Sequence, residues 1–222
     1  MELKPRHFKV AKGILLQMAQ ERTLEAVLSK VVEGNADRVR HAFTGIWLLD
    51  KGDLCRSCTM ANACTDQTQC LHLVASAGKL RGRLNSVQLL WQRIPLGVGE
   101  IGRIASTGRQ CIVSDLRLSN APVENREWMR AEGIRGFNGQ PIVYKGEVLG
   151  VLGMYNRHTI DMDEASMWWR MIADHIGAAI VNARAFEEIE RLKSSLETEN
   201  AYLREEVNES DAFETLWERV PL

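Results

Sequence analysis

The apolar positions near both ends of the chain follow a helical period. In residues 13–34 they recur at steps of three and four, which predicts one or two amphipathic helices, with Thr23 as a cap where the apolar face restarts. From about Asp163 the same period returns after an acidic turn and continues through Asn182 toward Val207. We therefore expect helices before and after a middle region of different character.

That middle region shows the patterns of β-strands. Residues 42–50 form an almost continuous apolar run, which predicts a buried strand. Residues 70–78 alternate, so we expect Leu71, Leu73 and Ala75 on one face of a second strand. Further strands are expected at 110–115, 140–144 and 147–155, and short helices before Gly108 and over 128–133. The order predicts an α/β fold of the α+β type, with a central antiparallel sheet and helices packed on one face.

A second period marks the C-terminal stretch. Its apolar seam follows alternating steps of four and three through Ala185, Ile189, Leu192, Leu196, Glu199 and Leu203. Glu199 interrupts the seam, and the run covers only about three heptads. A helix this polar is marginally stable without a partner, which favours a signalling or dimerising coiled coil over the alternative, a single solvated helix.

Length and charge exclude several classes of protein. The 222 residues suffice for one sensor-sized domain with helical extensions but are few for two independent cores. A net charge of −1 gives no general attraction to nucleic acid, and the basic segment 79–83 is more simply a solvated hairpin tip. No apolar run approaches the roughly 20 residues of a membrane span, and the N-terminus lacks a signal core. We expect a cytoplasmic protein that binds neither membrane nor nucleic acid directly.

Four of the five cysteines lie within one short segment, as Cys55, Cys58, Cys64 and Cys70. In a reducing compartment, clustered thiols are more often metal ligands than disulfides. The Cys-x-x-Cys spacing lets two sulfurs turn toward one centre, and the five-residue spacers let the chain bring two more. The intervening residues are polar and have little to bury, so a bound centre would supply the order that the loop otherwise lacks.

The nature of that centre stays open between an iron–sulfur cluster, most simply [4Fe–4S], and structural zinc. Zinc ribbons usually carry two Cys-x-x-Cys knuckles and this loop has one, which favours iron–sulfur. A thiol–disulfide switch and unligated thiols are further alternatives. His72 could replace a missing ligand, and Cys111 is interpreted as a small core residue.

Three segments, in the right order along the chain, resemble the GAF domain family. Residues 94–115 resemble its glycine-bearing turn, short helix and strand ending in Asp. Residues 141–155 resemble its closing hairpin, and residues 172–183 its last helix. This resemblance implies a helical lead at 1–19, a GAF domain at 20–185 with the cysteine loop at 55–70, and a signalling helix and tail at 186–222. It also implies a ligand pocket over the sheet, where the candidate lining residues are Trp47, Trp91, Trp128, Phe137 and Met154. Core packing explains each of these side chains equally well.

A narrower resemblance concerns residues 70–78 and 199–207, which look like parts of the sensory arm of bacterial enhancer-binding transcriptional activators. Those proteins depend on the nitrogen-type sigma factor and continue into an AAA+ ATPase. This sequence contains no Gly-x-x-x-x-Gly-Lys-[Ser/Thr] loop, so the ATPase is expected as an absent domain or as a partner in trans. Together with the coiled-coil period, this leads us to expect a homodimer formed through the N- and C-terminal helices.

The function expected from these features is that of a regulatory sensor and not an enzyme. The sensor would signal redox, gas or small-molecule state to a transcription-regulatory output module. One alternative is a thiol-based redox enzyme of the GAF methionine sulfoxide reductase type, using Cys58 and Cys64. Another is a small-ligand-binding GAF module with structural zinc. The Gly97-x-Gly99-x-x-Gly102 match to a dinucleotide motif lacks the βαβ context that would give it meaning.

Overall fold

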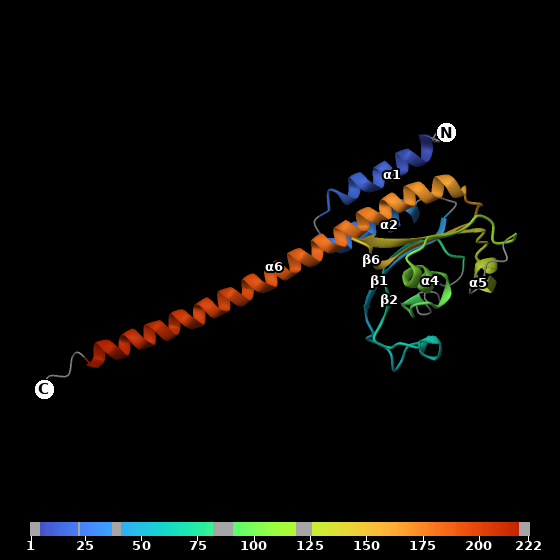
Figure 1. Cartoon of the computed structure of the whole chain (residues 1–222). Coiled ribbons are helices and arrows are strands. Elements are labelled where there is room, and N and C mark those ends of the chain that lie inside the picture. The colour runs from blue at the N-terminus through green and yellow to red at the C-terminus, as the bar shows by residue number, and fades with distance from the viewer. Residues whose placement is uncertain (1–4, 22, 37–40, 82–90, 119–125, 218–222) are drawn as a thin grey trace. The chain divides into compact units, whose positions relative to one another are not determined.

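Figure 1 shows the computed structural model, which describes residues 5–21, 23–36, 41–81, 91–118 and 126–217. The chain divides into two compact units, residues 1–180 and 181–222. No helix in the described residues is long and apolar enough to cross a membrane.

The first unit is built on a six-stranded sheet with the order β3-β2-β1-β6-β5-β4, in which every neighbouring pair is antiparallel. The strands are β1 (His41–Lys51), β2 (Gln69–Gly78), β3 (Arg93–Ile94), β4 (Cys111–Val113), β5 (Gly136–Tyr144) and β6 (Glu147–Asn156). The β5–β6 hairpin turns at Lys145 and Gly146, both at positive φ, as the Lys-Gly pair predicted. The predicted central antiparallel sheet is confirmed.

Helices cover both faces of this sheet, so the expectation that they pack on one face is wrong (Figure 1). On one face lie α1 (Pro5–Met18), α2 (Leu24–Ala36) and the part of α6 (Met162–Trp217) that ends at Ile180. On the other lie α4 (Gly99–Thr107) and α5 (Arg126–Ala131). The physical reason is that strands such as β1 are apolar on both faces, so each face has to be buried.

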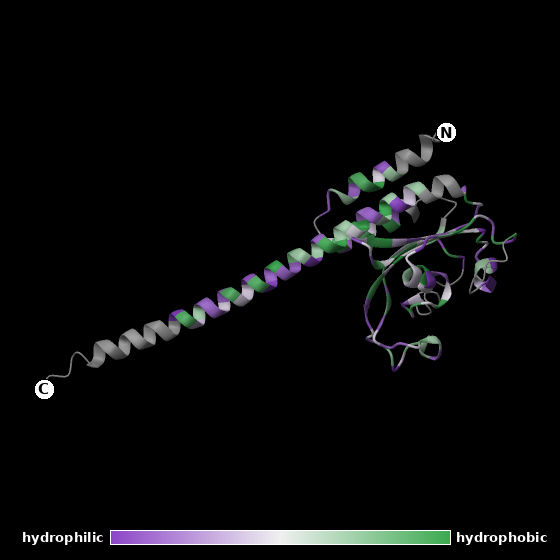
Figure 2. Ribbon diagram, viewed as in Figure 1, coloured by the Kyte–Doolittle hydropathy of each residue, from purple (hydrophilic) through white to green (hydrophobic). Residues whose placement is uncertain are grey.

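The two faces have different cores. The α1/α2/α6 face is aliphatic, with Ile46, Leu152 and Ile176 fully buried, whereas the core of the α4/α5 face contains a cluster of aromatic rings among its aliphatic side chains. In Figure 2 hydrophobic and hydrophilic residues alternate along the coloured part of α6.

One feature of β2 overturns the predicted side-chain alternation. Ile46 pairs with Ala75 but Trp47 pairs with Leu73, so Val74 is an extra residue, a β-bulge. Leu71 and Leu73 therefore pack on the aromatic side, while Ala75 packs with the aliphatic core. A bulge exchanges the faces of every residue after it, and a simple period of two cannot show it.

The second unit consists of the rest of α6, which extends to Trp217, beyond the predicted Val207. Half or more of the side chain is exposed at several large residues, among them Phe186, Ile189, Leu196 and Tyr202. Arg191 donates two hydrogen bonds to Glu188 one turn away. The coiled coil remains a prediction, and the exposed residues Ile189, Leu192, Leu196 and Leu203 belong to the seam that it would bury.

Candidate functional site

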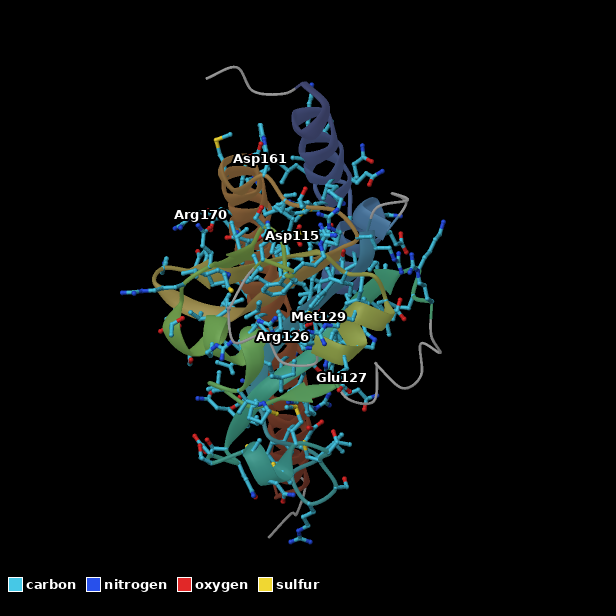
Figure 3. The ribbon with its side chains drawn as sticks, turned by 90° about the vertical axis from the view of Figure 1, so that its right-hand side faces the viewer. Asp115, Arg126, Glu127, Met129, Asp161 and Arg170 are labelled. Carbon is cyan, nitrogen blue, oxygen red and sulfur yellow. The ribbon has the colours of Figure 1, made fainter. Side chains whose placement is uncertain are left out.

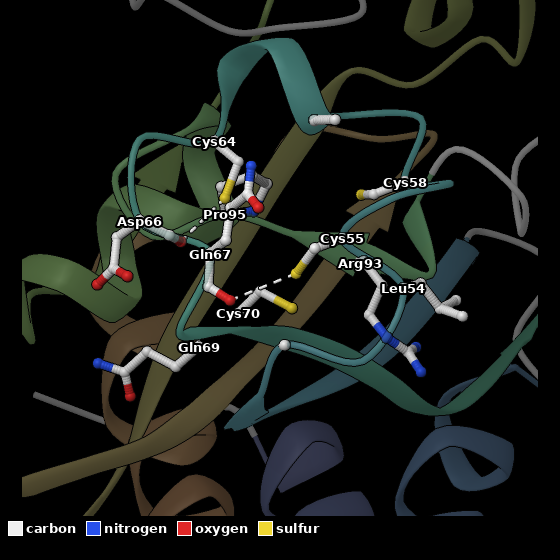
Figure 4. A pocket seen from close by; sticks show the side chains of 12 residues that line it. Leu54, Cys55, Cys58, Cys64, Asp66, Gln67, Gln69, Cys70, Arg93 and Pro95 are labelled. Atoms are coloured by element: carbon white, nitrogen blue, oxygen red, sulfur yellow. Dashed lines mark hydrogen bonds between the residues drawn. The ribbon is translucent and has the colours of Figure 1, made fainter.

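The four predicted cysteine ligands line one pocket at the end of the β1–β2 ladder (Figure 4). Cys70 lies opposite Asp50 in the ladder, and the Gly52 N–H donates to the Thr68 carbonyl at 2.9 Å, so the loop 52–68 leaves and re-enters the sheet at the same point. The wall facing the loop is supplied by Arg93 and Pro95, at and just after β3. Antiparallel pairing thus brings together cysteines that lie far apart along the loop.

Each thiol has a distinct environment. Cys70 is buried on β2, whereas Cys55, Cys58 and Cys64 are half-buried and all are free thiols. Cys55 Sγ donates to the Gln67 carbonyl at 3.3 Å and Cys64 Sγ to the Asp66 carbonyl at 3.0 Å. The Met60 N–H donates to Cys58 Sγ at 3.4 Å, a contact of the kind that tunes metal-bound sulfur.

The sulfurs share a pocket without forming a ligand set. Within the described ranges, no three His, Cys, Asp or Glu side chains are close enough together to hold a metal ion as they stand. The loop around them contains only one short 3₁₀ turn, η1 (Ala61–Ala63), and that turn buries no residue. Coordination would therefore require side-chain rotation and adjustment of the loop, and the lack of a packed interior permits this movement.

An ion pair borders the pocket. Asp53, just after β1, accepts from Arg93 Nε at 2.8 Å and also from Nη2. These hydrogen bonds hold the pKa of the Asp53 carboxyl well below its usual range. Burial raises the pKa of the Cys70 thiol to about 11; Arg93 opposes this shift, and Asp53, Cys55 and Cys58 add to it. His72 lies 3.7 Å from Asp53 and does not line the pocket formed by the described residues.

Four of the five predicted ligand-pocket residues, all but Met154, pack in the hydrophobic core on the α4/α5 face of the sheet. Trp91 lies 4.6 Å from Trp128 and 6.4 Å from Trp47 between ring centroids, and the Trp47 Nε1–H donates to the Trp91 carbonyl at 2.9 Å. Phe137 reaches the same cluster through Tyr155, at 4.9 Å. These edge-to-face and tilted contacts are those of a filled aromatic core.

Met154 is not part of this cluster. It lies between Gly153 and Tyr155 on β6, so strand alternation places it on the aliphatic face, opposite Thr44 and Asn138. Two cluster members, Phe43 and Tyr155, were missed at the sequence level. Phe43 lies four residues before Trp47 on β1, and Tyr155 four residues after Val151 on β6. An even spacing along a strand puts both residues on one face, and this was the signal available in the sequence.

A second charged group lies at the β4 edge of the sheet, around Asp115, which is labelled in Figure 3. Asp115 follows β4 and accepts two side-chain hydrogen bonds from Arg117, at 3.2 and 3.1 Å, and one from Arg135 at 2.6 Å. These arginines, Arg117 before Arg135, hold the pKa of the Asp115 carboxyl well below its usual range. Through these hydrogen bonds the carboxylate ties the segment after β4 to Arg135, just before β5.

Comparison with known proteins adds a family. The sequence model described as "GAF domain" matches residues 23–180, well over half of the chain. The solved GAF domain of a phosphoenolpyruvate-protein phosphotransferase (ptsP) from Coxiella burnetii is similar with 24% identity and a TM-score of 0.59, covering 82% of this chain and 96% of that one. No match was found among curated proteins.

Two other solved structures represent different functions. The free methionine-R-sulfoxide reductase from Neisseria meningitidis, in complex with its substrate, is 19% identical, with a TM-score of 0.57 and coverage of 81% and 90%. The A. aeolicus nlh2 GAF domain, in an inactive state, is 16% identical, with a TM-score of 0.57 and coverage of 81% and 98%. At these identities the likeness extends to the fold alone.

Proposed function

Because the chain belongs to the GAF domain family, we propose that it is a regulatory sensor domain whose four-cysteine loop binds a metal centre. A fold shared by a phosphotransferase GAF domain and a methionine sulfoxide reductase does not decide function by itself. The site has to carry the proposal.

The observation that carries it is the convergence of Cys55, Cys58, Cys64 and Cys70 on one pocket beside a guanidinium group. Four thiolates around one divalent ion have a net charge of about −2, so a neighbouring cation favours the assembly. The N–H that the Met60 backbone directs at Cys58 Sγ supports the same interpretation.

The single Cys-x-x-Cys knuckle favours a [4Fe–4S] cluster over structural zinc. A cluster bound here would make the loop responsive to redox state, oxygen or nitric oxide, whereas zinc would only order it. In either case the protein's own part is to supply the thiols from one hairpin and to direct the Met60 N–H at Cys58 Sγ. Cys55 and Cys64 would give up their S–H bonds to the Gln67 and Asp66 carbonyls when they lose their protons.

Ordering of the loop would act on β1 and β2, which flank it. Trp47 on β1 belongs to the aromatic core, and its neighbours Ile46 and Leu48 contact the aliphatic core that includes Ile176 of α6. We propose that α6 carries the change onward to a second copy of this chain or to an AAA+ ATPase of a transcriptional activator. Such coupling requires two states between which the bound centre discriminates.

The runner-up is a thiol-based redox enzyme. It is favoured by the fold likeness to methionine sulfoxide reductases and by two half-buried thiols, Cys58 and Cys64, in a pocket. Such an enzyme needs a reactive thiolate beside a resolving thiol.

The test is purification of the full chain without air, followed by iron, sulfide and zinc analysis and by absorption and Mössbauer spectra. Cys58→Ser should lose the centre, whereas Cys111→Ser, a matched change outside the loop, should keep it. The sensor proposal fails if the unsubstituted chain binds neither iron–sulfur nor zinc after reconstitution. Turnover of methionine sulfoxide with a thiol reductant would instead favour the enzyme.

A further inference from the structure

Arg93 is fixed in orientation more firmly than an exposed arginine would be. It lies on β3, paired with His72 of β2, and only about a fifth of its side chain is exposed. Its Nε and Nη2 bind both oxygens of Asp53, and its Nη1 donates to the Gln92 carbonyl at 2.8 Å. Three nitrogens of the guanidinium group are thus held before any ligand arrives, so little further rotamer entropy would be lost.

The held guanidinium lies at the border of the cysteine pocket, with its nitrogens turned toward Asp53 and the Gln92 carbonyl. Arg93 lines the pocket together with all four loop cysteines, whereas its partner Asp53 does not. The other charged side chain in the lining is Asp66, whose carboxylate accepts from the Thr68 N–H at 2.9 Å. Among the described lining residues Arg93 is therefore the cation available for offsetting charge on the sulfurs.

Resting on the proposed metal centre, we propose that Arg93 is a positioning residue of the four-cysteine site, which offsets the charge of the bound thiolates and so sets the affinity for metal. Four sulfurs that lose their protons repel one another in a partly buried space. A fixed positive charge at the wall lowers that repulsion without supplying a ligand. Asp53 then serves to aim the guanidinium group.

The test compares charge with shape in the full chain, using Zn²⁺ alone in competition with a chromophoric chelator. Arg93→Gln removes the charge and should weaken Zn²⁺ binding by about 10–100-fold, the usual effect of losing a partner outside the ligand set. Arg93→Lys keeps the charge without the fork and should stay within several-fold of the unsubstituted chain. Arg56→Gln, at an exposed arginine of the same loop that does not line the pocket, is the matched control and should change little.

Asp53→Asn tests whether Arg93 acts through its charge or only by holding the local structure together. The asparagine oxygen can still accept from Arg93 Nε, while the opposing negative charge is gone, so Zn²⁺ affinity should be unchanged or higher. The inference is overturned if Arg93→Gln binds like the unsubstituted chain, or if Arg93→Lys or Asp53→Asn loses as much affinity as Arg93→Gln. Failure of the unsubstituted chain to bind Zn²⁺ or a reconstituted cluster would overturn the proposed metal centre as well, whereas normal binding with an indifferent Arg93 would overturn this inference alone. Circular dichroism of the metal-free variants verifies folding.

Discussion

The aromatic cluster and the cysteine pocket share β1, β2 and the segment from Trp91 to Pro95, yet they obtain their order differently. Trp47, Trp91 and Phe137 are at most 7% exposed and pack ring against ring. Of the four cysteines that line the cysteine pocket only Cys70 is buried, and the loop is polar. Burial of apolar surface orders the first region without help, whereas the second has an ion pair and a few loop hydrogen bonds. The same hairpin therefore joins a rigid core to a segment whose order can depend on a ligand.

The largest effect is expected in the aromatic region. Trp47→Ala should lower the free energy of unfolding by about 3–5 kcal/mol, because it leaves a cavity and deprives the Trp91 carbonyl of its donor. Leu54→Ala, at a half-exposed residue of the cysteine loop, should cost about 0.5 kcal/mol or less. Urea denaturation measures both. Equal losses of unfolding free energy would show that the cysteine loop is ordered by apolar burial as much as the aromatic cluster is.

The next effect tests the loop's dependence on a ligand. Without metal, the double change Cys58→Ser with Cys64→Ser should alter the free energy of unfolding by no more than about 0.5 kcal/mol, since neither thiol is fully buried. With free metal at 100 times its Kd, the unsubstituted chain should gain about 2.7 kcal/mol and the double variant should gain nothing. Thermal melts with and without a chelator measure the gain, and an equal gain in both proteins would contradict the assignment.

A smaller effect concerns α4, which covers the aromatic region. Gly108 ends this helix at φ +64, so Gly108→Ala should destabilise by about 1 kcal/mol. Gly13→Ala offers a control of opposite sign: it lies inside α1 with nothing within 4 Å of the added methyl, and should stabilise by about 0.5–1 kcal/mol. Chemical denaturation measures the free energy of unfolding of both variants. If both variants lost similar stability, the backbone conformation at Gly108 would not be the cause of its loss.

The smallest effect is in acid, and it compares one carboxylate from each region. Asp115 and Asp53 both have a pKa depressed by arginine, so each contributes stability that is present above its ordinary pKa and is lost as the pH falls below about 4. Asp115→Asn should flatten the decline of the melting temperature between pH 5 and pH 2. Asp53→Asn should flatten it less, because Asp53 is 43% exposed and Asp115 only 9%. A larger effect of Asp53→Asn than of Asp115→Asn would show that the more exposed Asp53–Arg93 pair contributes more stability.

Much of the fold could be predicted from patterns along the chain. The turn at Lys145-Gly146, the short helix before Gly108 and the long helix from about Asp163 all follow from local residue types. The bulge at Val74 could not be predicted, since one extra residue reverses the faces without altering composition. The same uncertainty about faces placed Met154 among aromatic residues that pack on the other side of the sheet.

The sequence by itself determined the element types, the membership of the GAF family and the cluster of cysteines, because these depend on residues close together in the chain. Only the tertiary structure decided that helices cover both faces, that the four thiols share one pocket and that Arg93 borders that pocket. The Asp53–Arg93 pair joins residues 40 positions apart, and no periodicity records such a contact. It exists because the short β3 pairs with β2 beside the loop, an arrangement that sheet formation alone creates.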